Sequence, residues 1–317
     1  MRVFMAGGTG VIGSRLIPLL VSRGHTVFAT TSSPGKLDTL RRFGAEAMVM
    51  NGLDGVAVGH AVARTEPDVI VHQMTALAGT PDMRHFDRWF ATTNALRTEG
   101  TRHLLSAAEA VGVNRFVAQS FCGWPSRREG TKLTTERDPL DDEPLASQAE
   151  TMRAIQFVER AVLSAPLTGL VLRYGSLYGP GASDAMVEMV RRRQLPIVGR
   201  GRGVMSFIHA DDAAEATAIA VERGDSGVYN IVDDDPAPQR EWLPAMAAAL
   251  GAPPPRKVPV WLARLLAGEA VVRIMDETSG ASNAKARREL GWTPRWASWR
   301  DGFMRALVNE PRAGHAA

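Results

Sequence analysis

The sequence predicts an α/β fold: a doubly wound parallel Rossmann sheet with a smaller, mainly helical C-terminal domain. Three observations predict it. The chain opens with an apolar run, residues 3–6, that breaks into glycines spaced by three, Gly7, Gly10 and Gly13. Apolar runs then alternate with helical patterns as far as residue 175, which is typical of βαβ units. Beyond that point the pattern changes, and a proline-punctuated, mainly helical segment ends the chain.

The glycine turn joins the first strand to a helix. In such a unit Gly7 permits a sharp turn, Gly10 lets the backbone approach a pyrophosphate, and Gly13 lets helix and strand pack closely. The phosphates then bind unpaired N–H groups at the helix N-terminus. We therefore expect a dinucleotide site rather than a turn that only packs. Its residues in the turn are Gly7, Thr9, Gly10, Val11, Ile12 and Gly13.

The end of the second strand, residues 27–29, decides between NAD and NADP. An acidic side chain there would bind the ribose 2′-hydroxyl of NAD and repel the 2′-phosphate of NADP. The segment has no acid and instead offers hydroxyls and a cation, namely Thr31, Ser32, Ser33 and Lys36. We expect NADP, or NADPH, as the cofactor; the alternative interpretation is a solvated turn.

The next segments predict a helix, a strand, a helix and a strand at residues 37–43, 47–50, 56–64 and 69–72. Asp54 either bonds the adenine amine or caps the helix 56–64. The carboxyl end of the fourth strand faces the cofactor in a parallel sheet. We therefore expect Met74, Thr75 and Ala76 to line the pyrophosphate and ribose, and we place Asn94 and Tyr174 in the cofactor site as well.

The remaining elements divide the chain into two domains. The expected elements are a helix 94–111, a strand 115–120, a polar loop 126–144, a helix 147–165, a strand 170–173, a helix 185–193, a strand 196–198, an apolar run 204–208, a helix 211–222 and a strand 227–232. The length of the polar loop favours a cover over a site. We expect residues 1–175 with about 206–232 to bind the cofactor, and about 176–205 with 233–317 to bind the substrate.

Composition narrows the functional classes. The chain has 317 residues, 45% of them hydrophobic and 22% charged, with a net charge of +3, as in ordinary globular proteins. Its arginines are scattered among acids, which argues against a nucleic-acid partner. The single cysteine excludes an internal disulfide, and no histidine has metal-ligand spacing. Because the first strand begins at residue 3 and no apolar run reaches 18 residues, we expect a cytoplasmic protein without a membrane segment.

Several motifs together resemble the extended and atypical short-chain dehydrogenase/reductases, the NAD(P)-dependent epimerase/dehydratase-like superfamily. They are GGTGVIG at 7–13, VIVH at 69–72, RFV at 115–117 leading to Ser120, LRY at 172–174 with YGPG at 178–181, FIHADDA at 207–213 and ELGWTP at 289–294. The resemblance implies a Rossmann cofactor domain, a C-terminal domain for a small-molecule substrate, and commonly a homodimer built from helices 94–111 and 147–165.

The resemblance also implies a serine, a tyrosine and a lysine beside the nicotinamide. Ser120 matches the serine. The tyrosine and lysine would fall at Thr151 and Ile155, which can do neither task. None of the three tyrosines, Tyr174, Tyr178 and Tyr229, is followed four residues later by a lysine. The usual proton-transfer pair is therefore missing from the sequence.

The proton must then come from another group, and the candidates are Ser120, Tyr178, Lys132 and His209. We take Ser120 and Tyr178 as the catalytic candidates, although the Tyr-Gly-Pro-Gly turn favours packing or cofactor contact for Tyr178, and His209 favours bonding to backbone. The expected substrate pocket contains Cys122, Trp124 and Thr151. The smaller domain should hold the tryptophans of the C-terminal half as core, or against an aromatic ligand; they are Trp242, Trp261, Trp292, Trp296 and Trp299.

Three functions follow from these expectations. The first is an NADPH-dependent oxidoreductase that reduces a small carbonyl, enone or imine with an atypical proton donor. The second is an NADP-binding sensor that carries out no chemistry. The third, a nucleotide-sugar epimerase or dehydratase, normally needs the missing tyrosine.

Overall fold

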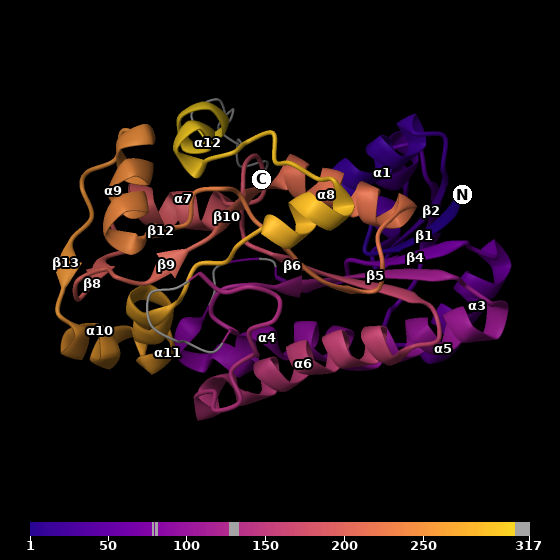
Figure 1. The fold of residues 1–317 in the computed structure, drawn as a ribbon, viewed down its shortest axis with the longest axis horizontal. Helices are drawn as coiled ribbons and strands as arrows, with labels where there is room; N and C mark the ends of the chain where they lie inside the picture. Colours follow the sequence, from indigo (N-terminus) through magenta and orange to yellow (C-terminus); the bar gives the residue numbers. More distant parts are fainter. Residues whose placement is uncertain (78, 80–81, 127–132, 308–317) are drawn as a thin grey trace.

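The computed structural model describes residues 1–77, 79, 82–126 and 133–307. At its centre is a sheet of seven parallel strands (Figure 1), in the order β11-β6-β5-β4-β1-β2-β3. The strands are β1 (Arg2–Ala6), β2 (Thr26–Thr31), β3 (Glu46–Val49), β4 (Val69–His72), β5 (Arg115–Phe121), β6 (Thr168–Tyr174) and β11 (Gly227–Ile231). The order reverses between β1 and β4, which leaves a crevice at the carboxyl ends of these two strands. The predicted doubly wound sheet is confirmed.

Helices cover both faces of this sheet (Figure 1). The helices α1 (Gly13–Ser22) and α8 (Ala210–Glu222) lie on one face, and α3 (Gly55–Thr65), α5 (Thr101–Val111) and α6 (Ala149–Ser164) lie on the other. Helix α2 (Leu37–Arg42) connects β2 to β3. Each face has its own apolar core, so that along β5 Val117 belongs to one core while Phe116 and Ala118 belong to the other. This two-sided burial explains why the strands read as continuous apolar runs.

The helix expected at 94–111 begins earlier and is interrupted. Helix α4 (Phe86–Ala95) passes into a π-helical turn, η3 (Leu96–Gly100), which leads into α5. A short 3₁₀ turn, η2 (Met83–His85), precedes α4 and is capped by Asp82. Turns of the π type inside a helix shift the side chains that follow and often mark functional sites.

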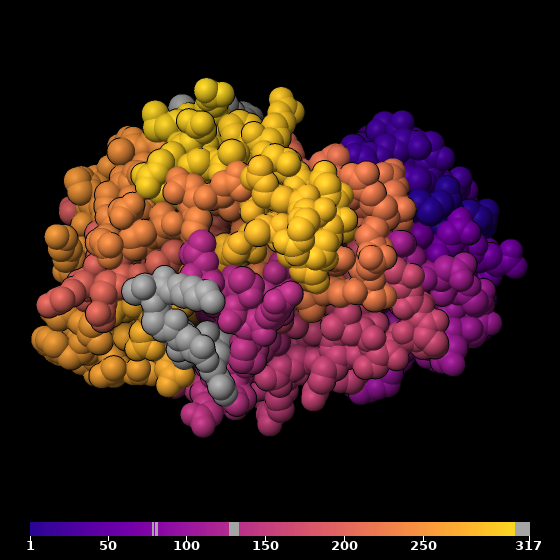
Figure 2. Space-filling view, viewed as in Figure 1, coloured from indigo at the N-terminus to yellow at the C-terminus, as the bar shows by residue number. Residues whose placement is uncertain are grey.

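The remaining segments form the smaller unit. Three two-stranded sheets pair β7 (Ser176–Tyr178) with β10 (Phe207–His209), β8 (Ile197–Val198) with β13 (Lys257–Val258), and β9 (Val204–Met205) with β12 (Ala237–Pro238). The helical segments of this unit are α7 (Asp184–Arg191), α9 (Gln239–Ala249), α10 (Val260–Ala267), α11 (Glu269–Val272), η5 (Arg273–Glu277) and α12 (Trp299–Ala306), whereas η6 (Ala286–Leu290) packs in a core of the large sheet. In Figure 2 the indigo N-terminal segments lie at one end of the long axis and the orange segments of the smaller unit at the other. Within the described residues, no helix has the length and apolarity needed to cross a bilayer.

The tryptophans of the C-terminal half have different environments. Trp242 and Trp299 lie in the core of the smaller unit, and Trp296 stacks on His209. Trp292 instead packs with α8 in a core of the large sheet, because the segment from Ala286 to Trp292 runs back over that helix. Trp261 is 66% exposed on α10. The expectation of a common core in the smaller domain was therefore wrong for Trp292 and Trp261.

Candidate active site

The three glycines of the first turn meet different surroundings. Gly7 has φ +94°, and a Cβ there would lie 2.7 Å from the carbonyl oxygen of Gln73. A Cβ on Gly13 would lie 2.5 Å from the carbonyl oxygen of Gly8. A Cβ on Gly10 would meet only the Gly7 oxygen, at 3.8 Å, an ordinary contact. Gly7 and Gly13 are therefore needed for the protein's own packing, whereas the open side of Gly10 leaves room for a ligand.

The same turn presents free hydrogen-bond donors. The backbone N–H groups of Val11, Ile12 and Gly13 donate to no acceptor in the described chain. Ser14 Oγ and Arg15 Nη1 both donate to the Val11 carbonyl oxygen, which fixes the turn. Free N–H groups at the first turn of α1, beside the crevice where the strand order reverses, suit the diphosphate of a dinucleotide. These residues fit the expected cofactor.

At the end of β2, two of the four expected residues have exposed side chains that a ligand could contact. Ser32 and Lys36 are exposed, and their side chains bond no described residue. Ser33 is half-buried, and its backbone N–H donates to Thr31 Oγ1. Thr31 itself is buried, and its hydroxyl fixes the conformation of the loop. Asp54 accepts hydrogen bonds from the N–H groups of Val56 and Ala57 through Oδ1, so it caps α3. Its side chain is exposed, and the contact with adenine stays a prediction.

Hydrogen bonds to side chains of β4, β5 and α4 fix the segment that follows β4. The Met74 N–H donates to His72 Nδ1 and the Met74 carbonyl accepts from Gln119 Nε2, while the Ala76 N–H donates to Thr93 Oγ1. Thr75 is exposed and makes no such bond. Thr75 is thus the residue of this segment whose polar groups stay free.

Tyr174 lies beneath this segment and does not reach a cofactor. Its hydroxyl accepts from Gln73 Nε2 and donates to Thr217 Oγ1, because Thr217 itself donates to the Ala213 carbonyl. Burial raises the pKa of Tyr174 to about 12. The prediction of a direct cofactor contact was wrong for Tyr174. It positions Gln73, whose Oε1 is buried without a partner.

Asn94 and Thr151 also have structural partners. Asn94 Nδ2 donates to Thr151 Oγ1 at 2.9 Å, and Thr151 Oγ1 donates to Asp87 Oδ1 at 2.6 Å. Thr151 is completely buried, and Asn94 Oδ1 is enclosed. The predictions of a cofactor contact for Asn94 and a substrate contact for Thr151 were wrong, because these polar groups tie α4 to the start of α6.

Ser120 belongs to a buried ion pair that the sequence analysis did not find. Its hydroxyl donates to Glu159 Oε1 at 2.8 Å. Arg173 donates to both oxygens of Glu159, at 2.8 Å and 2.6 Å. Burial opposes the charge on Arg173, yet its pKa is raised because Glu159 accepts these bonds. The Ser120 proton is thus committed to Glu159, and a contact of Ser120 with substrate stays a prediction.

The other candidate donors are unsuited to proton transfer or lie outside the described residues. Tyr178 is 1% exposed in the aromatic core of the smaller unit, edge-on to Phe207 and Phe303. Its hydroxyl is enclosed and burial raises its pKa, so the prediction of a catalytic Tyr178 was wrong. His209 Nδ1 accepts from the Asp211 N–H at the start of α8, the expected backbone role. Lys132 lies outside the described residues.

Of the expected substrate-pocket residues, Trp124 lines a small cavity, and Cys122 is buried in an apolar cluster. Cys122 packs against Val232 and Ala281, and burial raises the pKa of its thiol to about 12. Trp124 lies at a small cavity of about 10 Å³ between α6 and the smaller unit, which has room for about one water molecule. The lining residues are Trp124, Asp141, Gln148, Met152, Arg273 and Ile274.

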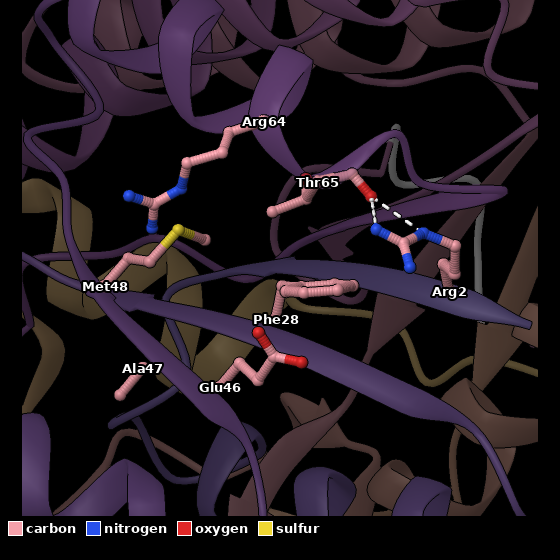
Figure 3. A pocket seen from close by; sticks show the side chains of 7 residues that line it. All are labelled: Arg2, Phe28, Glu46, Ala47, Met48, Arg64 and Thr65. Carbon is pink, nitrogen blue, oxygen red and sulfur yellow. Dashed lines mark hydrogen bonds between the residues drawn. The ribbon is translucent and has the colours of Figure 1, made fainter.

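A larger cavity lies at the opposite edge of the sheet. Its volume is about 390 Å³, and its lining residues come from the first strands and the end of α3. Figure 3 shows Arg2 turned toward Thr65, whose carbonyl oxygen accepts from the Arg2 guanidinium. Because Arg2 begins β1, this cavity is at the amino ends of the strands, away from the glycine turn. It is not the dinucleotide site.

The described part of the polar loop is bonded to the rest of the protein. The Thr134 N–H donates to the Gly280 carbonyl, and Glu136 Oε1 accepts from the Asn230 N–H at the end of β11. The loop therefore runs across the carboxyl edge of the sheet and meets the smaller unit. The segment 127–132 of the expected cover lies outside the described residues.

A family model described as the NAD dependent epimerase/dehydratase family matches residues 3–232. The chain belongs to this family. It is an oxidoreductase of the short-chain dehydrogenase/reductase type, and a nicotinamide dinucleotide is its cofactor class.

Two curated relatives and one solved structure are similar to this chain over most of its length. The chain is 44% identical over 310 residues to a 3-diazoavenalumate denitrifying reductase of a Streptomyces species, covering 96% of this chain and 100% of the relative. It is 29% identical to the 2-alkyl-3-oxoalkanoate reductase of Stenotrophomonas maltophilia, covering 80% and 77%. The human epimerase family protein SDR39U1, solved with NADPH, has TM-score 0.75, 22% identity and coverage of 98% and 100%. At that identity the likeness shows the fold alone.

Three features were not predicted from the sequence: Arg97, which is buried in η3, the buried Glu159–Arg173 pair, and Arg273 at the small cavity. Two of them carried a signal. Glu159 is in phase with Ile155 and Val162 on the buried face of α6. Arg97 is in phase with the buried stripe of α5, which includes Leu104 and Ala108. A charge in phase with an apolar stripe indicates a buried partner or a ligand.

Proposed function

We propose that this family member is an NADPH-dependent reductase that transfers hydride to an electrophilic substrate without a proton from a tyrosine. Bound NADPH would supply the hydride. The free N–H groups of Val11, Ile12 and Gly13 bind its diphosphate, and Ser32, Ser33 and Lys36 bind its 2′-phosphate. The lack of an acid at this end of β2 supports NADP over NAD.

The observation that carries the proposal is the start of α6. The family resemblance places the proton-transfer pair at Thr151 and Ile155, which are both buried and neither of which can act as an acid at neutral pH. Reduction of a carbonyl requires a proton on its oxygen in addition to hydride. Replacement of a diazonium group by hydride does not, because Ar–N₂⁺ + H⁻ gives Ar–H + N₂ with nothing left over.

The substrate we propose is therefore an aromatic acid that carries a diazo group. The name of the 44% identical relative joins a diazo substrate, a reduction and a loss of nitrogen. In this chain Trp124 offers an aromatic wall at the carboxyl end of β5. Arg273 lies near Trp124 at the same small cavity, and its side chain bonds no described residue. It can bind a carboxylate once this cavity widens to admit the substrate.

Deuteride transfer tests this proposal. With NADPH that carries deuterium at the transferred C4 position, we expect 3-carboxybenzenediazonium to yield arene with one deuterium on the ring, and one N₂ per NADPH consumed. Mass spectrometry and gas analysis measure the two products. The Gly10→Ala protein and an enzyme-free sample give the background reaction. NADPH consumption with ketones alone would contradict the diazo substrate.

A carbonyl, enone or imine substrate is the second candidate, and the name of the Stenotrophomonas relative supports it. The required proton would then come from solvent. The same deuterated cofactor with a panel of ketones separates the two candidates. Tight NADPH binding without turnover of any substrate would instead support the sensor.

Cofactor preference gives a separate prediction. In the Ser32→Asp protein we expect the ratio of the Kd for NADP⁺ to the Kd for NAD⁺ to rise about 10- to 100-fold, because a carboxylate repels the 2′-phosphate and accepts from the 2′-hydroxyl. Isothermal calorimetry with both cofactors measures the ratio. Gln194→Asp puts the same charge on an exposed site of the smaller unit and should leave the ratio unchanged. Tighter binding of NAD⁺ than of NADP⁺ by the wild type would refute the proposed preference.

A further inference from the structure

Arg97 is a buried cation without a partner. It lies in the π turn η3 and is 8% exposed. No described carboxylate pairs with it, and its side chain donates no hydrogen bond to the described residues. Nη1 is fully enclosed and has no hydrogen-bond partner. Nε and Nη2 also bond no described residue, but they are not fully enclosed. The guanidinium thus retains open donors on one side.

Among the described residues a second arginine, Arg173, is also buried, and it shows what Arg97 lacks. Arg173 is as deeply buried, but Glu159 binds it through two hydrogen bonds. Burial alone acts on Arg97 and lowers its pKa to about 10. An unpaired buried charge lowers the free energy of unfolding, because no ion pair or hydrogen bond compensates its loss of hydration. Such a group is expected where a ligand supplies the missing negative charge.

The surroundings of η3 place Arg97 beside the crevice. His72 Nδ1 accepts from the Met74 N–H, so its Nε2 carries the proton and donates to the Leu96 carbonyl. A Cβ on Gly100 would lie 3.2 Å from Met74 Cε. Burial is the main reason why the pKa of His72 is lowered to about 4, and the charge of Arg97 acts in the same direction. The π turn therefore packs on the carboxyl end of β4, one wall of the crevice.

Helix α6 fixes the position of Arg97 along that wall. The Asn94–Thr151 hydrogen bond sets α4 and α6 side by side. Both helices run back from the carboxyl edge of the parallel sheet, so they point the same way. Arg97, one turn beyond Asn94, is therefore level with Ile155, one turn beyond Thr151. A cation from the neighbouring helix is thus present at the level where the resemblance places a lysine.

We propose that Arg97 binds the nicotinamide half of the dinucleotide, through the oxygens of its phosphate or ribose. This inference rests on the cofactor in the proposed function and is independent of the substrate. The enclosed cation would hold the redox end of the cofactor in place of the missing lysine. An anionic group of the substrate is the competing source of negative charge, and the experiment separates the two.

Two ligands and two substitutions test the assignment. Calorimetry measures the Kd of NADP⁺ and of adenosine 2′,5′-bisphosphate, which lacks the nicotinamide half. We expect Arg97→Met to weaken NADP⁺ about 10- to 100-fold, as for the loss of charge-assisted hydrogen bonds, and to leave the bisphosphate unchanged. Arg97→Lys should restore part of the loss. Arg102→Met is the control, because Arg102 is exposed on α5 and pairs with Glu99.

Stability distinguishes this role from a structural one. Replacing an unpaired buried charge by an apolar side chain should leave the Tm of the ligand-free protein unchanged or raise it. The Tm increase caused by NADP⁺ should be smaller than in the wild type. A lower Tm with unchanged NADP⁺ affinity would overturn the proposal in favour of a structural role. An unchanged Kd for NADP⁺ with a raised KM for substrate would overturn it in favour of substrate binding. If the wild type bound no NADP⁺, the cofactor of the proposed function would fail first.

Discussion

The Gly10→Ala protein is expected to fold like the wild type and to lose nearly all affinity for NADP(H). A Cβ at residue 10 meets only the Gly7 carbonyl oxygen, at 3.8 Å, so the ligand-free protein has room for it. The same methyl group occupies the space from which a diphosphate would reach the N–H groups of Val11 and Ile12. Loss of two charge-assisted hydrogen bonds, each about 1.5–3 kcal/mol, corresponds to at least about 100-fold in Kd. Calorimetry with NADP⁺ measures the loss.

Gly13→Ala is the matched substitution at the next glycine. Its Cβ would lie 2.5 Å from the Gly8 carbonyl oxygen, in contact with backbone that cannot turn aside. We expect a loss of about 1–3 kcal/mol in the free energy of unfolding, as in other overpacked sites. Thermal unfolding of both ligand-free proteins makes the comparison. Normal NADP⁺ binding by the Gly10→Ala protein would contradict the assignment of the turn. A Gly10→Ala protein that is as unstable as the Gly13→Ala protein would also contradict it.

The sequence was sufficient to predict the parallel sheet, because each strand and the glycine turn can be recognised from a few consecutive residues. Each parallel strand is buried on both faces and appears as an apolar run, and the glycine turn needs its residue types at fixed spacing. Helix α4 was missed because it has only three buried residues in ten, Phe86, Thr93 and Asn94, and so shows no apolar stripe. Trp261 and Trp292 were misplaced because hydrophobicity does not say which surface a side chain meets.

The chemistry of the site depended on partners that no local pattern shows. Ser120 stands where the resemblance places a serine, but its hydroxyl bonds Glu159, which lies 39 residues away in the chain. Tyr178 is of the right chemical type, and only the aromatic cluster around it shows that its hydroxyl is enclosed. Asp54 had two interpretations in the sequence, and the hydrogen bonds to Val56 and Ala57 show the capping role, which leaves Oδ2 available for the predicted adenine contact.

The Glu159–Arg173 pair should dominate the stability of the region behind the site. In the Glu159→Leu protein the Arg173 guanidinium stays buried without an acid, and the Ser120 hydroxyl loses its acceptor. Removing one partner of a buried ion pair typically costs about 3–5 kcal/mol. We expect a loss of that size in the free energy of unfolding of the ligand-free protein, measured by urea denaturation so that cofactor binding does not contribute.

The double substitution decides whether this cost comes from an uncompensated charge. Glu159→Leu combined with Arg173→Met removes both charges and leaves an apolar site of similar volume, and such replacements are often neutral or stabilising. The double variant should therefore be more stable than Glu159→Leu alone, whereas a simple sum of two losses would make it less stable. Additive losses would show that the two side chains act through packing. Recovery would show that Glu159 and Arg173 stabilise the carboxyl ends of β5 and β6 as one electrostatic unit.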